Sequence, residues 1–233
     1  MFIKTLTKNL PIFSNWQTIL VTFILEPFFS VLFFYLISPY TNKEKLLLTA
    51  IVLTTIYKVM SVYSQIFVHA QNIDILKLIF INKRGFLLFN LTAYSIAILV
   101  AMIQSGILIA LYSVFNITIQ IGLQQLVIIT ALTIIYTIII SAIVVITFIG
   151  AQNPYFGSNL LSGLLPIISA TVVPISFYPD WLALISRVLP FWLIQTAVWS
   201  GNVNATAIIV YIAVYATILY TVFTYRRKKI LKF

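Results

Sequence analysis

The chain has 233 residues, of which 62% are hydrophobic and 8% charged, and its mean hydropathy is +1.10. Soluble domains carry about a quarter charged residues, so a water-soluble core is excluded. With no cysteine, one histidine and four carboxylates, we expect no metal site, no cofactor on this chain and no enzymatic centre. The net charge of +10 is better explained by basic residues flanking membrane spans than by nucleic-acid binding.

Charged residues and turn formers divide the apolar sequence into segments long enough to cross a bilayer. A spanning helix needs about 20 apolar residues. The sequence therefore predicts an all-α membrane protein with a single transmembrane domain. Its six expected spans are about 16–38, 46–70, 86–115, 126–150, 160–178 and 203–225.

The basic residues predict the orientation, because cytoplasmic flanks carry an excess of Lys and Arg. The opposite side of a six-span arrangement receives only Lys43, Lys45 and Arg187, partly offset by Glu44 and Asp180. Both termini are therefore predicted to be cytoplasmic. The ten basic residues on their side are Lys4, Lys8, Lys77, Lys83, Arg84, Arg226, Arg227, Lys228, Lys229 and Lys232.

Residues 179–201 are apolar enough to suggest a seventh span, but a re-entrant pair of short outer helices fits better. A seventh span would place Arg187 in the hydrocarbon at a cost of about 3 kcal/mol. It would also move the basic tail to the outer side. Pro179 and Pro190 divide the stretch, and Asp180 is a suitable N-cap.

Two opposite charges fall inside the expected spans. Glu26 precedes Pro27 in the first span, and Lys58 lies at a similar depth in the second. Intramembrane charges normally pair or face water. The two residues are therefore interpreted either as a structural pair, or with Lys58 extending to the membrane surface, or as a polar element of a translocation pathway or of the subunit interface.

Two segments have amphipathic helical patterns. In residues 71–84, apolar side chains recur at three- and four-residue spacing, with polar residues between them. Residues 1–16 form a second candidate, an interfacial connecting helix. Either segment is suited to the membrane surface or to a partner's groove. In residues 71–84 the apolar positions are Ile73, Leu76, Ile79 and Phe80, and the polar ones include Asp74 and Lys77.

A proline- and tryptophan-containing segment, Pro174 to Trp192, begins at the end of the fifth expected span and continues into the stretch before the sixth. This segment resembles the corresponding region of ABC-2 type permeases, especially bacterial drug and peptide exporters. Glu26-Pro27 is similar to another recurrent feature of that family, and the arrangement of spans matches over the whole chain.

The resemblance implies a multi-pass permease subunit of the bacterial plasma membrane. It would pair with a second copy or a paralogue and with separate ATP-binding cassette subunits that carry ATP and Mg²⁺. Spans one, two and five would line the route of an amphipathic or lipophilic cargo, such as a peptide toxin, an antimicrobial peptide or a drug. Residues 71–84 would form the coupling helix, with Ile73, Asp74, Leu76, Lys77, Ile79 and Phe80 as its ATPase-coupling residues.

Two other classes of protein stay open. A secondary transporter or channel often shows inverted repeats, and no convincing repeat relates the two halves of this sequence. A membrane immunity or sensor protein would bind a peptide without moving it. No P-loop motif occurs, so ATP hydrolysis by the P-loop route would need another chain.

Overall fold

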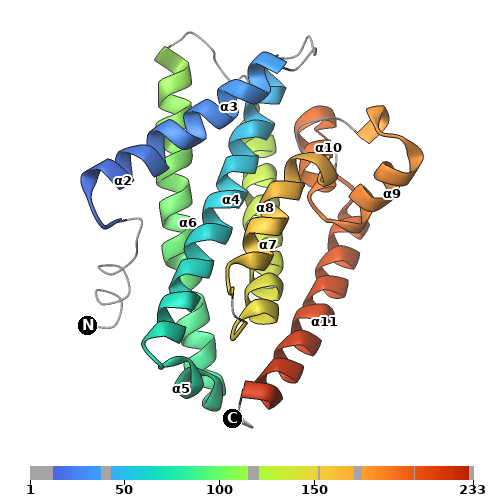
Figure 1. Cartoon of the computed structure of the whole chain (residues 1–233). Coiled ribbons are helices and arrows are strands. Elements are labelled where there is room, and N and C mark those ends of the chain that lie inside the picture. Colours follow the sequence, from blue (N-terminus) through green and yellow to red (C-terminus); the bar gives the residue numbers. More distant parts are fainter. Residues whose placement is uncertain are drawn as a thin grey trace.

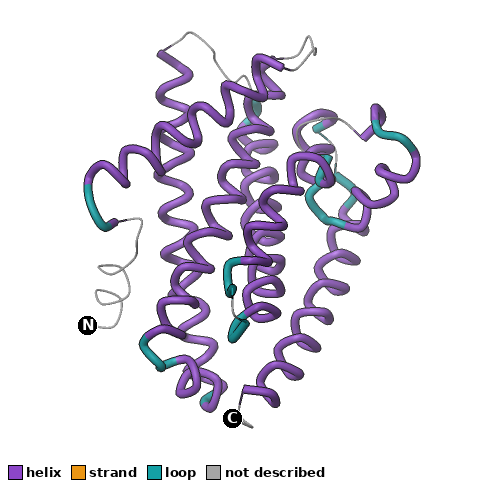
Figure 2. Tube along the Cα trace, viewed as in Figure 1, coloured by secondary structure: helices purple, strands orange, loops and turns teal. Residues whose placement is uncertain are grey.

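The computed structural model describes residues 13–37, 43–114, 121–151, 153–170, 175–201 and 203–230. These residues form helices joined by turns, without strands (Figures 1 and 2). The elements are α2 (Trp16–Leu20), η2 (Val21–Leu25), α3 (Glu26–Ile37), α4 (Lys43–Asn72), α5 (Leu76–Ile81), α6 (Lys83–Val114), α7 (Leu123–Phe148), α8 (Phe156–Ile168), η3 (Ile175–Phe177), α9 (Asp180–Val188), α10 (Trp192–Ser200) and α11 (Ala205–Ile230).

Among the described residues, five helical segments are long and apolar enough to cross a membrane. They are the composite α2–η2–α3, then α4, α6, α7 and α11, which correspond to expected spans one, two, three, four and six. The chain is therefore a helical protein with the character of a multi-pass membrane protein. Its six-span arrangement and its orientation stay predictions.

The fifth expected span, 160–178, differs most from the structure. Helix α8 ends at Ile168, and its 13 residues correspond to about 20 Å, less than the roughly 30 Å of a hydrocarbon core. It ends where Ala170 adopts a positive φ of 52°, a conformation that a right-handed helix cannot continue. The Tyr178 hydroxyl donates to the Ile167 carbonyl at 2.5 Å. This hydrogen bond satisfies one of the main-chain carbonyls at the C-terminal end of α8.

Helix α4 is the centre of the bundle. It packs against α3, α6, α7, α8 and α10, and most of its apolar window is buried inside the chain. In Figure 1 the first span crosses α4 and α6 obliquely. Of the other spanning segments, α3, α6 and α7 pack directly on α4, whereas α11 packs on α7.

The two ends of the bundle are held by different contacts. At one end, which carries α5 and the C-terminal part of α11 (Figure 1), the Gly150 N–H donates to Gln71 Oε1 at 3.2 Å. At the other end, Lys45 Nζ donates to the Trp199 carbonyl at 2.8 Å. Gln125 Nε2 donates to the Ala197 carbonyl, also at 2.8 Å.

The outer segment expected at 179–201 forms α9 and α10, which are bent by 103° at the break between them. Neither helix is long enough to span a membrane by itself, and re-entrance stays a prediction. The connecting helix expected at 1–16 lies mainly outside the described residues, as do the side chains of Lys77 and Lys83.

Candidate functional site

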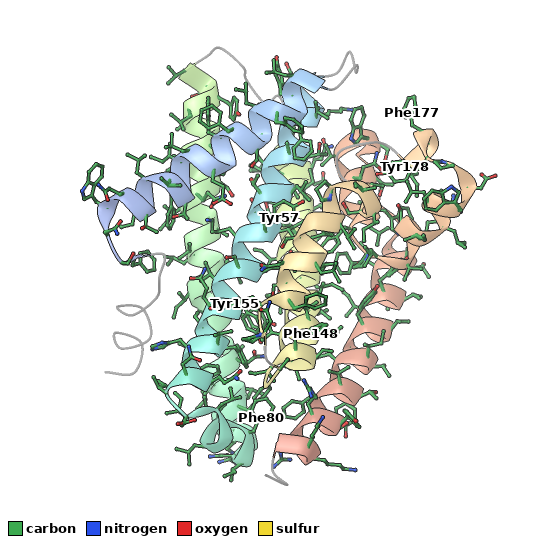
Figure 3. All side chains as sticks on the ribbon, viewed as in Figure 1. Tyr57, Phe80, Phe148, Tyr155, Phe177 and Tyr178 are labelled. Carbon is green, nitrogen blue, oxygen red and sulfur yellow. The ribbon has the colours of Figure 1, made fainter. Side chains whose placement is uncertain are left out.

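A polar cavity of about 340 Å³ lies between the first span, α4, α6 and α8. Every lining residue except Pro27 has a polar side chain, although 62% of the chain is hydrophobic. Figure 3 labels Tyr57, which stands on the α4 side. The lining residues are Thr18, Thr22, Glu26, Pro27, Ser30, Thr54, Tyr57, Lys58, Ser61, Gln65, Gln104, Asn159 and Ser162.

The first span is not a regular α-helix where it borders this cavity. Val21–Leu25 form a π-helical turn, in which the Glu26 N–H donates to the Val21 carbonyl. The Thr22 carbonyl thereby loses its α-helical donor, and its partner in the π pattern would be residue 27. Because that residue is Pro27, which has no N–H, the Thr22 carbonyl is left without a backbone donor.

Lys58 of α4 satisfies this carbonyl. Its Nζ donates to Thr22 O at 2.7 Å and lies 5.4 Å from the centre of the Phe23 ring. The side chain is only 8% exposed, so a buried cation is stabilised by a backbone dipole and an aromatic face. Lys58 therefore joins the first span to the centre of the bundle.

Three buried polar atoms on the cavity wall have no hydrogen-bond partner among the residues that the structure describes. They are the Tyr57 hydroxyl, Gln65 Oε1 and Gln104 Oε1, and the Gln104 side chain is only 1% exposed. Buried polar groups in proteins are nearly always satisfied. Their clustering in one cavity indicates a place for water or for a ligand.

The sequence predicts Glu26 and Lys58 at similar depth, and the structure brings both to this cavity. The observed hydrogen bond of Lys58 goes to the Thr22 backbone, four residues before Glu26. Sequence reasoning missed Tyr57, Gln65 and Gln104. A signal for one of them was present, because polar residues recur along α4 at three- and four-residue spacing, at Thr54, Lys58, Ser61 and Gln65.

A second candidate site is the outer surface of α5, between α4 and α6. The structure buries three of the apolar residues expected to couple to an ATPase in the chain's own core: Leu76, Ile79 and Phe80. Figure 3 shows Phe80 at this end of the bundle. Asp74 is exposed, and the exposed apolar side chains are Ile73, Leu78 and Ile81, at 45%, 67% and 57%.

The exposed side of α5 continues into an apolar groove of about 380 Å³ against the first turns of α6. Its lining includes Leu78, Asn82, Leu88 and Thr92. Leu78 therefore belongs both to the exposed surface and to the groove.

The C-terminal arginines of α11 hold the ends of two other helices. Arg226 donates to the carbonyls of Ile146 and Ile149, at 3.1 and 2.9 Å, and also to that of Thr147. Arg227 donates to the last carbonyls of α5. Side chains that satisfy C-terminal carbonyls stabilise helix ends, so these residues do more than mark orientation.

The outer residues singled out from the sequence lie at helix ends and at the bend. Pro179 precedes α9 and Asp180 is its first residue, where a negative charge is favourable. Arg187 is in its last turn, and Pro190 is buried at the break before α10. No pathway or metal role follows from this arrangement.

Comparisons of the chain with protein-family models, with curated proteins and with solved structures found no match.

Proposed function

We propose that this chain is the transmembrane permease subunit of an ATP-binding cassette exporter in the bacterial plasma membrane. Its proposed cargo is an amphipathic or lipophilic compound. The resemblance to ABC-2 type permeases motivates the proposal. The polar cavity supports it, since its lining comes mainly from the first span, α4 and α8, the counterparts of the spans expected to border the route.

One observation carries the proposal: α5 is a short helix at one end of the bundle that exposes apolar side chains. Leu78 and Ile81 are more than half exposed on a helix of six residues. Exposed apolar residues of this kind mark interaction sites. The proposed occupant is an ATP-binding cassette subunit, which would supply ATP and Mg²⁺.

The contacts of α5 provide a path from such a subunit to the spans. α5 packs against α6, α4 and α11, and Arg227 bonds its last carbonyls to α11. A displacement of α5 by a closing ATPase would therefore act on three spanning helices. For export, the two access states must differ in their affinity for the cargo.

The permease would act with a second copy or a paralogue. The first span offers large exposed apolar side chains for that contact or for lipid, including Phe29, Phe33 and Leu36. In this arrangement the cargo route would be completed by both permeases.

Co-purification tests the proposal. The tagged chain is expressed together with the products of its neighbouring genes, and any bound ATPase is measured after detergent extraction. Leu78→Asp with Ile81→Asp is expected to lower the bound ATPase at least about tenfold, because a charge would be buried in an apolar contact. Phe177→Asp, an exposed apolar residue in η3, is the matched control and should retain it. Absence of any ATPase, or equal binding by all variants, contradicts the proposal.

The polar cavity would also fit a secondary transporter. Proteoliposomes that contain this chain, prepared with and without the ATPase, separate the two functions. Cargo accumulation driven by an ion gradient without ATP would favour the secondary transporter, whereas accumulation that requires the ATPase and ATP supports the exporter.

A further inference from the structure

We propose that the polar cavity binds a cationic headgroup rich in N–H donors, a primary ammonium or guanidinium, with Glu26 as its counter-ion. The inference names the class of cargo and in that sense rests on the proposed export function. It is based on the hydrogen-bond acceptors of the cavity wall that have no donor among the described residues.

Three of the seven hydroxyl groups on the wall donate to main-chain carbonyls of their own helices, whereas the Tyr57 hydroxyl has no partner among the described residues. Thr22 donates to the Thr18 carbonyl, Ser30 to the Glu26 carbonyl at 2.8 Å, and Thr54 to the Ile51 carbonyl at 2.8 Å. Each hydroxyl has one proton to donate and two lone pairs. The hydroxyl oxygens of Thr22, Ser30 and Thr54 therefore have only their lone pairs to offer to a ligand.

The carbonyl oxygens of two glutamine side chains add further acceptors. Gln65 Nε2 donates to Ser61 Oγ at 3.2 Å, while Gln65 Oε1 and Gln104 Oε1 have no partner in the described part of the chain. The Glu26 carboxylate lies on the same wall and is exposed. A ligand with several N–H groups would satisfy these acceptors, which is the usual state of buried polar groups.

The cation of the wall is already stabilised. Lys58 Nζ is bonded to the Thr22 carbonyl and lies against the Phe23 ring. An anionic headgroup would gain attraction to Lys58 and one donor, the Tyr57 hydroxyl, but it would meet the Glu26 carboxylate and the two unpartnered amide oxygens. The arrangement thus favours a cation over an anion.

The size of the cavity fits a headgroup. A volume of about 340 Å³ is at the small end of ligand pockets, so a long apolar tail would remain outside. Exposed apolar side chains stand next to lining residues in the sequence: Leu25 before Glu26, and Leu160 after Asn159. An amphipath would place its cation in the cavity and its tail along this apolar surface.

Binding of short matched probes tests the inference. Hexylamine, hexylguanidinium, hexanoate and hexanol are titrated against the purified full chain in neutral-lipid nanodiscs, by calorimetry and by the shift in unfolding midpoint. Empty nanodiscs provide the blank. The two cations are expected to bind saturably, and hexanol and hexanoate are not.

Variants identify the groups involved. Glu26→Gln is expected to weaken hexylamine binding at least about tenfold, because a charge-assisted hydrogen bond is lost. Gln104→Leu is expected to weaken it several-fold. Glu44→Gln removes an exposed carboxylate in the first turn of α4 and should leave binding unchanged.

Three outcomes overturn the inference: equal binding of all four probes, hexylamine binding that is unchanged in Glu26→Gln, or hexanoate binding that is lost in Lys58→Gln. Because Gln104→Leu can lose its fold, the conservative Glu26→Gln variant decides. Failure here with an ATPase still bound to α5 rejects only the cation site. Cation binding without any ATPase partner rejects the export function instead.

Discussion

Arg227 donates from its guanidinium Nε to the main-chain carbonyl of Phe80 at 3.0 Å. The same side chain donates to the Ile81 carbonyl at 3.1 Å. The last turn of α5 is therefore closed by a residue 146 positions later in the chain. The Phe80 and Phe223 rings, stacked with centroids 5.9 Å apart, add an apolar contact between the same two helices.

Loss of the Arg227 guanidinium is expected to release α5 without unfolding the bundle. In Arg227→Gln, hydrogen exchange of residues 76–81 should rise by roughly tenfold or more, since hydrogen bonds from charged groups contribute about 1.5–3 kcal/mol. Arg227→Lys should be intermediate, because an ammonium lacks the planar fork. Lys228→Gln, at the exposed neighbouring position, is the control. Unchanged exchange in Arg227→Gln would contradict a role in holding α5.

The contribution of Lys58 is expected to depend on Pro27. Lys58→Met leaves the Thr22 carbonyl unsatisfied and should lower the free energy of unfolding by about 1–3 kcal/mol. Pro27→Ala supplies an N–H five residues after Thr22, so the same Lys58→Met change should cost less in that background. A double-mutant cycle of unfolding free energies measures this coupling, expected at 0.5 kcal/mol or more, on the order found for contacting residues. Additive effects would reject the link.

The contact between α7 and α8 allows no side chain at Gly157. A Cβ there would overlap the Phe148 ring and lie 2.9 Å from Val144 Cγ1. Gly157→Ala is expected to destabilise the chain by about 1–3 kcal/mol through overpacking, seen as a lower unfolding midpoint in detergent. Gly163, in the same helix, has nothing within 4 Å of its Cβ position, so Gly163→Ala should be neutral or stabilising. Equal midpoints would contradict the packing.

Two tyrosines of α11 hold the break between α9 and α10. Tyr215 donates to the Val188 carbonyl at 2.7 Å, and Tyr211 donates to the Arg187 carbonyl. Tyr215→Phe should cost about 0.5–1.5 kcal/mol and raise hydrogen exchange near residue 189. Tyr220→Phe, at an exposed position of α11, should do neither. A Tyr215→Phe variant with native exchange at the break would contradict this role.

Long apolar segments were predictable because a continuous run of about 20 apolar residues has few alternatives to a spanning helix. The end of α8 was not. It depends on the left-handed backbone of Ala170 and on the Tyr178 hydroxyl that reaches Ile167. Neither leaves a periodic signal, and Pro166 alone does not end the helix, since it lies inside α8.

The buried face of α5 was equally hidden in the sequence. Leu76 and Ile79 are buried whereas Leu78 and Ile81 are exposed, yet all four are aliphatic. Hydrophobic residues on a helix predict that they will be buried. They do not show whether they are buried in the chain's own core or against a partner. The depth of Glu26 and Lys58 was predictable by counting residues, while Gln104 came to the cavity only through the packing of α6.

The π-helical turn at Val21–Leu25 also sets the angular phase of the first span. Thr18, Thr22, Glu26 and Ser30 recur every four residues, and all four line the cavity. On an ideal α-helix, residues four positions apart differ by about 40° in their direction around the helix axis, which adds up to about 120° from Thr18 to Ser30. A turn that holds more residues offsets this drift. One widened turn thus keeps polar residues at four-residue spacing aligned on one side of the first span. The rest of that helix is mainly apolar.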